Sequence, residues 1–260
     1  MKEKSRSENN ENKEQTGKLE GRNPVMEALR AGREIDRMLV LKGNKEGSIK
    51  RIVSAAKEKG IRIQEADRKQ LDRISSTGSH QGVIAFAAAG KYAEVEDIIK
   101  RARSLSEPPF IIILDGITDE HNLGSIIRTA ECAGVHGVII PKRRAAGLSP
   151  VVAKSSAGAV EYVLVARVVN ISRTIEYLKS NNIWVVGTDV SGEKTCFEKD
   201  LTGPVALVIG SEGKGMGRLV GEKCDFTVRI PVVGSVSSLN ASVAAAVVTY
   251  EVYRQRQKSG

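Results

Sequence analysis

Between residues 110 and 231 the chain repeats one pattern, in which a short continuous apolar run is followed by a polar or helical stretch. The runs are FIIILD at 110, HGVIIP at 136, YVLVARV at 162, IWVVGTD at 183, PVALVIG at 204 and FTVRIP at 226. Continuous hydrophobicity indicates strands buried on both faces, and helices between such strands are typical of a parallel sheet. This part of the chain is therefore predicted to be an α/β domain built on a parallel sheet.

Two connections between these runs, 123–134 and 172–182, carry helical periodicity, and so does the segment 238–258 after the last run. In open α/β sheets, ligands bind in the loops that follow the carboxyl ends of the strands. The loops of this kind that are rich in Gly, Ser, Asn or Asp are 115–125, 187–194, 210–217 and 231–240. The functional site is expected among them.

A smaller α/β pattern precedes this domain, at residues 21–90. Residues 1–20 are nearly free of aliphatic side chains and are predicted to be a disordered tail. Residues 91–108 carry a helical period that closes on Pro108 and Pro109, and they are predicted to be a linker. The larger domain is then expected to span 109–260.

Positive charge is concentrated in the smaller domain. The whole chain has a formal net charge of +9, and residues 21–90 contribute +6 of it. A basic folded module suits attraction to a polyanion such as nucleic acid, but excess charge also serves solubility. Charge alone therefore leaves both interpretations open.

Several classes of protein are disfavoured by composition. No run of eighteen apolar residues occurs and the N-terminus is polar, so a membrane span and a secretion signal are not expected and the chain is predicted to be cytoplasmic. Cys132, Cys196 and Cys224 are odd in number and widely spaced. We expect reduced core thiols, and neither a disulfide framework nor a metal site.

The glycine-rich segment GSEGKGMGR, residues 210–218, matches no common nucleotide-binding motif. A Walker loop would need Lys and Ser or Thr where Met216 and Gly217 stand, and the spacing for a GxGxxG dinucleotide fingerprint also fails. A small-molecule Rossmann enzyme is therefore disfavoured. A tight turn and a ligand-binding loop both fit the segment.

Two further segments carry polar side chains next to helices. In HNLGSIIRTA, Asn122 stands where a helix N-cap is wanted, and Arg128 follows among mostly apolar or small residues, so it is expected to be enclosed against an anion, a phosphate or an internal ion pair. Ser238 and Asn240 precede the last helix, where they suit either capping or the orientation of a hydroxyl substrate. No hydrolase constellation occurs at recognisable spacing.

The stretches NLGSIIRTA, LVIGSEGKGM and IPVVGSVSSLNAS, in this order and at this separation, resemble the three motifs of the SpoU (TrmH-like) family of RNA ribose 2′-O-methyltransferases. The likeness spans residues 21 to about 256, because GRNPVMEAL, HQGV and KSSAGAVEYV are similar to matching parts of the bacterial 23S rRNA guanosine 2′-O-methyltransferases of that family. One departure is Glu120, where many members have Pro.

This resemblance implies a fold, a cofactor and an assembly. The fold is that of the SPOUT class: a parallel sheet with a C-terminal trefoil knot, preceded by an L30e-like RNA-binding domain and built as a homodimer. S-adenosylmethionine is expected to lie bent in the knot. Its contacts by family position are Gly210, Ile230, Leu239 and Thr188.

The resemblance also implies a reaction, in which a methyl group passes to the ribose 2′-hydroxyl of a guanosine in the peptidyl-transferase loop of 23S rRNA. Arg128 has the central role in the family, often as general base, and Asn122, Ser238, Asn240 and Glu212 complete the catalytic set. Because arginine, with a pKa above about 12, is a poor base, we expect Arg128 to stabilise the developing alkoxide instead. The alternatives are the same chemistry on tRNA and a non-catalytic RNA-binding assembly factor.

Overall fold

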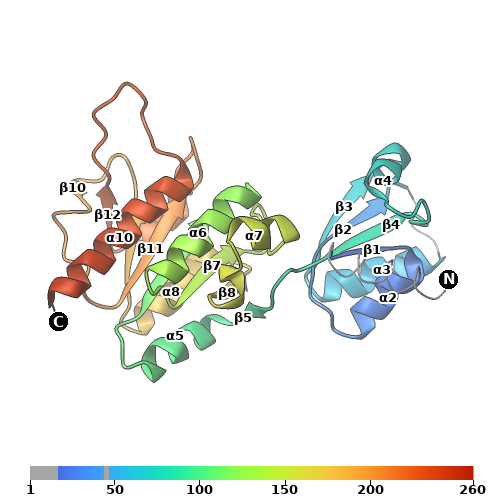
Figure 1. Ribbon diagram of the computed structural model, residues 1–260, viewed down its shortest axis with the longest axis horizontal. Coiled ribbons are helices and arrows are strands. Elements are labelled where there is room, and N and C mark those ends of the chain that lie inside the picture. Colours follow the sequence, from blue (N-terminus) through green and yellow to red (C-terminus); the bar gives the residue numbers. More distant parts are fainter. Residues whose placement is uncertain (1–16, 44–46, 260) are drawn as a thin grey trace, which may run out of the picture. The chain divides into compact units, whose positions relative to one another are not determined.

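The computed structural model describes residues 17–43 and 47–259, which form two compact units (Figure 1). The first unit runs to Lys91 and includes Gly147–Pro150, and the second contains the rest of the described chain. Most of the predicted tail lies outside the described residues. Lys18–Glu20, however, form strand β1, because Leu19 packs against the core of the first unit and the backbone pairs with another strand.

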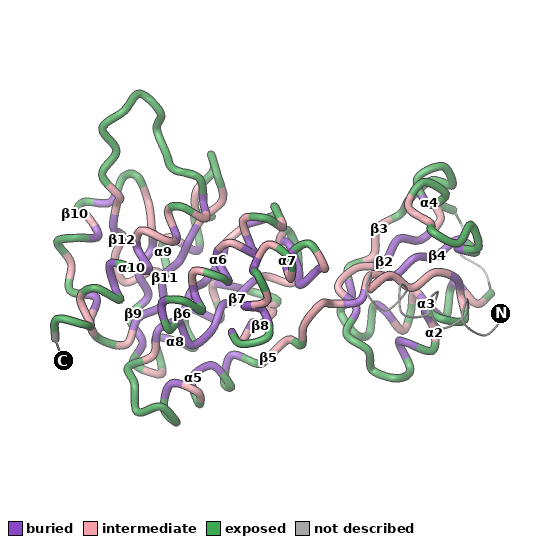
Figure 2. Tube along the Cα trace, in the orientation of Figure 1, coloured by how far each residue is buried: buried purple, intermediate pink, exposed green. Residues whose placement is uncertain are grey.

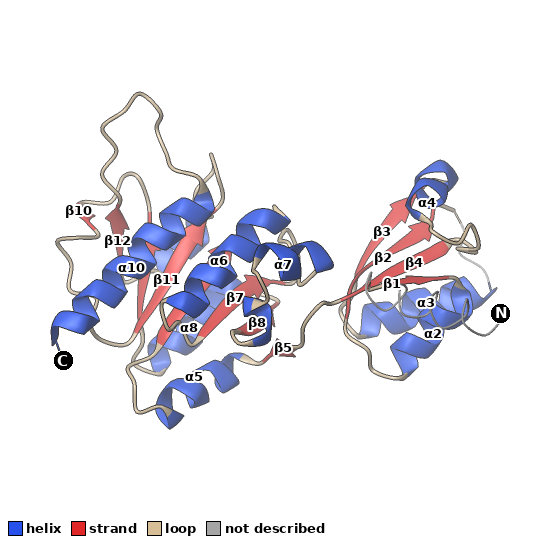
Figure 3. Cartoon of the chain, in the orientation of Figure 1, coloured by secondary structure: helices blue, strands red, loops and turns tan. Residues whose placement is uncertain are grey.

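The first unit is a four-stranded sheet in the order β1-β4-β2-β3. Its remaining strands are β2 (Ile35–Leu41), β3 (Arg62–Ala66) and β4 (Val83–Ala87), and only β2 and β3 pair in parallel. Helices α2 (Arg22–Arg30) and α3 (Gly47–Glu58) cover one face, while α4 (Arg68–Ile74) packs on the other through Leu71 (Figure 3).

The second unit is built on an eight-stranded sheet in the order β10-β12-β9-β11-β6-β7-β8-β5, in which every pairing is parallel. The strands are β5 (Tyr92–Ala93), β6 (Phe110–Asp115), β7 (Gly137–Pro141), β8 (Leu164–Val168), β9 (Trp184–Thr188), β10 (Lys194–Thr195), β11 (Val205–Gly210) and β12 (Phe226–Arg229). The predicted parallel sheet is therefore confirmed.

Helices cover both faces of this sheet (Figures 1 and 3). The segments are α5 (Val95–Ser104), α6 (Glu120–Cys132), α7 (Pro150–Ser155), the 3-10 turn Ala159–Glu161, α8 (Ile171–Ser180), α9 (Arg218–Lys223) and α10 (Ala241–Ser259). Helices α5, α8 and α9 pack into one core with the strands, and α6 packs beside α10. The trefoil knot stays a prediction.

Of the predicted linker, residues 92–108 are part of the second unit and do not form a free connector. Strand β5 pairs with β8, and the buried side chains Ile98 and Ile99 of α5 join the main core. Buried and exposed residues alternate along α5 (Figure 2), so the helical period of this segment is the core-facing stripe of a packed helix. Among the described helices, none is long and apolar enough to cross a membrane.

Candidate active site

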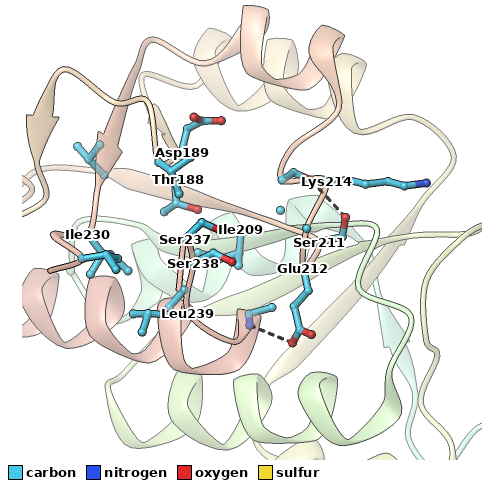
Figure 4. Close-up of a pocket in the computed structure, with 18 residues that line it drawn as sticks. Thr188, Asp189, Ile209, Ser211, Glu212, Lys214, Ile230, Ser237, Ser238 and Leu239 are labelled. Atoms are coloured by element: carbon cyan, nitrogen blue, oxygen red, sulfur yellow. Dashed lines mark hydrogen bonds between the residues drawn. The ribbon is translucent and has the colours of Figure 1, made fainter. Parts of the chain in front are cut away.

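Because the sheet is parallel, the carboxyl ends of β6, β9, β11 and β12 meet at one edge, and a cavity of about 260 Å³ lies there (Figure 4). Its lining comes from Thr188–Val190 after β9, from Ile209–Gly215 at the end of β11, and from residues between Val228 and Ala244. Three of the four loops expected to hold the site therefore line one cavity.

The glycine-rich loop after β11 is both a tight turn and a wall of this cavity. Ser211 and Gly215 exchange backbone hydrogen bonds of 3.0 and 2.8 Å, which folds the loop back over Gly210. A Cβ on Gly210 would lie 2.2 Å from the carbonyl carbon of Gly215, so only glycine fits there. The tight turn is therefore confirmed, and the ligand-binding role stays a prediction for a loop that lines a cavity.

Asp115, at the end of β6, holds the far end of the same loop. Its Oδ2 accepts a hydrogen bond of 2.7 Å from the backbone N–H of Gly217. The sequence reasoning did not select this residue, although a carboxylate directly after a buried strand was the available signal.

All four residues matched to cofactor contacts line the cavity: Thr188, Gly210, Ile230 and Leu239. The Thr188 hydroxyl donates to the Val208 carbonyl at 2.9 Å, which fixes its orientation. Ile209, Ile230 and Leu239 supply apolar wall, while Ser237 and Ser238 add hydroxyl groups (Figure 4). An apolar concavity with a few polar groups is typical of small-molecule sites.

A hydrogen-bonded cluster of Asn122, Glu212 and Asn240 adjoins the cavity, which Glu212 itself lines. Glu212 Oε1 accepts from Asn122 Nδ2 at 2.9 Å, from Asn240 Nδ2, and from the backbone N–H of Ala241 at 3.2 Å. Asn240 Nδ2 also donates to Asn122 Oδ1 at 3.0 Å. The structure thus joins three residues of the predicted catalytic set, which come from separate segments of the chain.

The prediction that Asn122 is a helix N-cap is wrong. Helix α6 begins earlier, at Glu120, and its cap is Asp119, whose Oδ1 accepts from the backbone N–H of Asn122 at 2.8 Å. The Asn122 side chain is therefore free to bond Glu212. Asn240, in contrast, does cap its helix, since its Oδ1 accepts from the backbone N–H of Ser242 at 3.0 Å.

The prediction that Arg128 is enclosed is also wrong. Its neighbours Ile126 and Ile127 are buried, but Arg128 itself is exposed. It makes no hydrogen bond or ion pair with any part of the chain that the structure describes, and it does not line the cavity. The six-residue separation puts it about 9 Å along the helix axis from Asn122.

The three cysteines lie in different environments. Cys196 is buried as expected of a core thiol, whereas Cys132 is exposed, since it lies at the C-terminal end of α6. Burial raises the pKa of the half-buried Cys224 to about 11, which keeps this thiol protonated at neutral pH. Within residues 17–43 and 47–259, no group of three or more His, Cys, Asp or Glu side chains could hold a metal ion.

Comparison with known families places both units of the chain among RNA-modifying proteins. Residues 109–250 match the SpoU rRNA Methylase family, and residues 18–93 match the RNA 2′-O ribose methyltransferase substrate-binding domain. A Bacillus subtilis protein assigned to the TrmH family of tRNA/rRNA methyltransferases, YacO, is 51% identical over 92% of this chain and 96% of its own length. The chain belongs to the SpoU family of RNA methyltransferases, as its motifs indicated.

Solved structures of SpoU methyltransferases are also similar to this chain. The SpoU methyltransferase AviRb from Streptomyces viridochromogenes, solved in complex with AdoMet, is 27% identical with a TM-score of 0.59, and the match covers 94% of this chain and 92% of AviRb. The A. aeolicus TrmH/SpoU tRNA modifying enzyme is 28% identical with a TM-score of 0.54, and the match covers 63% of this chain and 86% of that enzyme.

Proposed function

We propose that this chain transfers the methyl group of S-adenosylmethionine to the ribose 2′-hydroxyl of a guanosine in the peptidyl-transferase loop of 23S rRNA. The observation that carries the proposal is the cavity at the carboxyl edge of the sheet, bordered by the cluster of Asn122, Glu212 and Asn240. The match of residues 18–93 to a ribose-methyltransferase substrate-binding domain supports RNA as the partner.

S-adenosylmethionine fits the chemistry of the cavity lining. Ile209, Ile230 and Leu239 offer an apolar wall of the kind an adenine ring requires, and loop backbone with the hydroxyls of Ser237 and Ser238 offers partners for polar groups. AviRb, which shares the fold, was solved with this cofactor. When bound, it supplies an electrophilic methyl group on a sulfonium.

The reaction requires the ribose 2′-oxygen to be aligned with the methyl carbon. The oxygen–carbon bond forms as the carbon–sulfur bond breaks, S-adenosylhomocysteine leaves, and the hydroxyl proton passes to solvent. We assign Arg128 to the developing alkoxide and a neighbouring phosphate, because a guanidinium without a partner among the described residues is free to bind both. Glu212 holds the amides of Asn122 and Asn240 in fixed positions, from which they orient the ribose. Ser238, on the exposed loop after β12, adds a hydroxyl from the cavity side.

We also propose that the chain acts as a homodimer through α10. Val243, Tyr250 and Tyr253 are 47%, 47% and 41% exposed, and their spacing puts them along one side of the helix. A second copy would bury this apolar stripe. Sedimentation should show a dimer, and replacement of Tyr250 and Tyr253 by Lys should give a monomer.

Two observations favour ribosomal RNA over tRNA. Residues 109–250 match the SpoU rRNA Methylase family, and the A. aeolicus tRNA modifying enzyme matches only 63% of this chain. The second candidate is a tRNA ribose methyltransferase. It is supported by relatives assigned to a family that serves both tRNA and rRNA.

The test is methyl transfer from labelled S-adenosylmethionine to unmodified 23S rRNA, with tRNA in parallel, followed by mapping of the modified ribose. The proposal expects 2′-O-methylguanosine in the peptidyl-transferase loop. Label in tRNA alone would overturn the substrate, and RNA binding without label in either would favour a non-catalytic assembly factor.

A further inference from the structure

One face of the sheet in the first unit carries a line of cationic and aromatic side chains. Strand register pairs Lys18 with Phe86, Phe86 with Arg37, and Arg37 with Arg62. Residues paired across neighbouring strands point to the same face, so these four side chains form one row across the sheet.

The row lies on the same face as α4. Met38 and Ala85, which alternate with the row, pack in the core beneath α2 and α3. Leu39 and Ile84 pack instead with Leu71 of α4, and because side chains alternate along a strand, Arg37 and Phe86 share that face. Helix α4 adds three exposed cations to it, Arg68, Lys69 and Arg73.

Most of these cations are available to a ligand. Lys18 donates to the Ile74 carbonyl at 2.7 Å and to Ser76 Oγ, so its charge is engaged. Arg37, Arg62 and the cations of α4, by contrast, have no hydrogen bond or ion pair with the residues that the structure describes.

The nearby carboxylates already have other partners. Glu20 accepts hydrogen bonds from Ser75, Ser76 and Thr77, Asp72 pairs with His80 at 2.9 Å, and Asp67 caps α4 through the backbone N–H of Gln70. The face therefore has an excess of unpaired positive charge.

Arg37 also has a planar neighbour. Its guanidinium carbon lies 4.4 Å from the centre of the Phe86 ring, a cation–π contact that holds the guanidinium over the ring. A guanidinium held in this way offers a flat surface on which a nucleobase stacks, and N–H groups that bind phosphate. An acidic peptide would use the charges but not the stacking surface.

We infer that this face, formed by Arg37, Arg62, Phe86 and the cations of α4, binds a single-stranded segment of the RNA substrate. One base stacks on the Arg37 and Phe86 pair, while the N–H groups of Arg37, together with Arg62 and the cations of α4, bind phosphates. The inference rests on the proposed function in taking RNA as the substrate, and it adds the surface and the mode of contact.

The test measures, by fluorescence anisotropy, how tightly the full chain binds a transcript of the peptidyl-transferase region of 23S rRNA. The measurement is repeated at salt concentrations between about 50 and 200 mM. Replacing Arg37 and Arg62 together by Ala should weaken binding by about tenfold or more and reduce the salt slope by about 1.4, the value for two lost phosphate contacts on a single strand. Phe86→Leu keeps an apolar side chain in the sheet and should weaken binding about fivefold or more with an unchanged slope.

The matched control is the pair Lys50→Ala and Arg51→Ala on α3, which removes the same charge from exposed positions on the opposite face. Equal weakening by the control would overturn the inference, as would normal binding by the Arg37 and Arg62 variant. Methyl transfer by the wild-type chain separates the two proposals. If the wild-type chain transfers methyl groups but the Arg37 and Arg62 variant binds RNA normally, only the inference about this face is overturned. If the variant binds RNA weakly but the wild-type chain transfers no methyl group, only the proposed function is overturned.

Discussion

Two glutamates, one in each unit, hold together segments that are distant in sequence, and one of the two, Glu212, lines the cavity described above. The side chain of Glu20 is 5% exposed and accepts hydrogen bonds from three consecutive residues of one loop, Ser75 to Thr77. Glu212 is exposed and accepts from Asn122, Asn240 and the start of α10.

The difference separates a structural carboxylate from a site carboxylate. Burial alone would raise the pKa of Glu20, but hydrogen bonds from Ser75, Ser76 and Thr77 outweigh it and lower the pKa to about 2. Those donors belong to the loop that Glu20 fixes, so no ligand is needed to complete the arrangement. Glu212 instead positions amide groups beside a cavity that a ligand can enter.

The largest effect is expected from a residue outside both clusters. Arg128→Ala should lower the methyl-transfer rate about a thousandfold, because it removes the group assigned to the developing alkoxide, and should leave S-adenosylmethionine binding unchanged. Single-turnover kinetics and calorimetry would measure the two. Arg128→Lys is the control for charge, and near-normal turnover by it would contradict a role specific to guanidinium.

Replacing each of the two glutamates by alanine tests the comparison between them. Glu212→Ala should lower the transfer rate about a hundredfold, since the amides of Asn122 and Asn240 lose their common acceptor. Glu20→Ala should leave the rate of the folded protein unchanged while lowering its stability. If Glu20→Ala slowed single-turnover transfer at saturating RNA, the assignment of Glu20 to structure alone would be incorrect.

The pH dependence of stability should report Glu20 directly. Its pKa falls from 4.5 to about 2 on folding, so its contribution is complete above about pH 5 and is lost as the pH falls through the folded value. The full contribution is about 3 kcal/mol, of which about 2 kcal/mol should be lost between pH 7 and pH 3. Urea unfolding of the wild type and of Glu20→Gln would measure it, and equal losses in both would exclude Glu20 as the source.

The smallest effect is expected from one hydrogen bond at the cavity wall. Thr188→Val keeps the shape of the side chain and removes the bond to the Val208 carbonyl, so S-adenosylmethionine affinity should fall by less than about tenfold. Calorimetric titration would measure it. A loss above a hundredfold would mean that the hydroxyl contacts the cofactor itself.

Sequence patterns predicted the strands that have long apolar runs and missed short elements that lack a run or a period. Six of the seven strands between residues 110 and 231 were located by their continuous apolar runs, and β10, which has only two residues, was not. Strand β5 has only two residues, and α9 begins directly after the glycine-rich loop, so neither produces a detectable period. These elements are fixed by tertiary pairing and packing.

For the site, too, the sequence predicted one part and missed another. Loop composition after the strands pointed to the right edge of the sheet, but the bonds of Glu212 to Asn122 and Asn240 join segments 90 and 28 residues apart and leave no local pattern. The burial of Arg128 was predicted wrongly because its neighbours in sequence, Ile126 and Ile127, point in other directions from the helix and their burial does not enclose it.

The most direct test of the proposed site is a crystal structure of the protein with S-adenosylhomocysteine, the product of methyl transfer. The ligand should occupy the cavity between Thr188, the loop at Gly210–Gly215 and Leu239, with its sulfur toward the cluster of Asn122, Glu212 and Asn240. A ligand bound elsewhere on the chain, with this cavity unchanged, would contradict the assignment of the site.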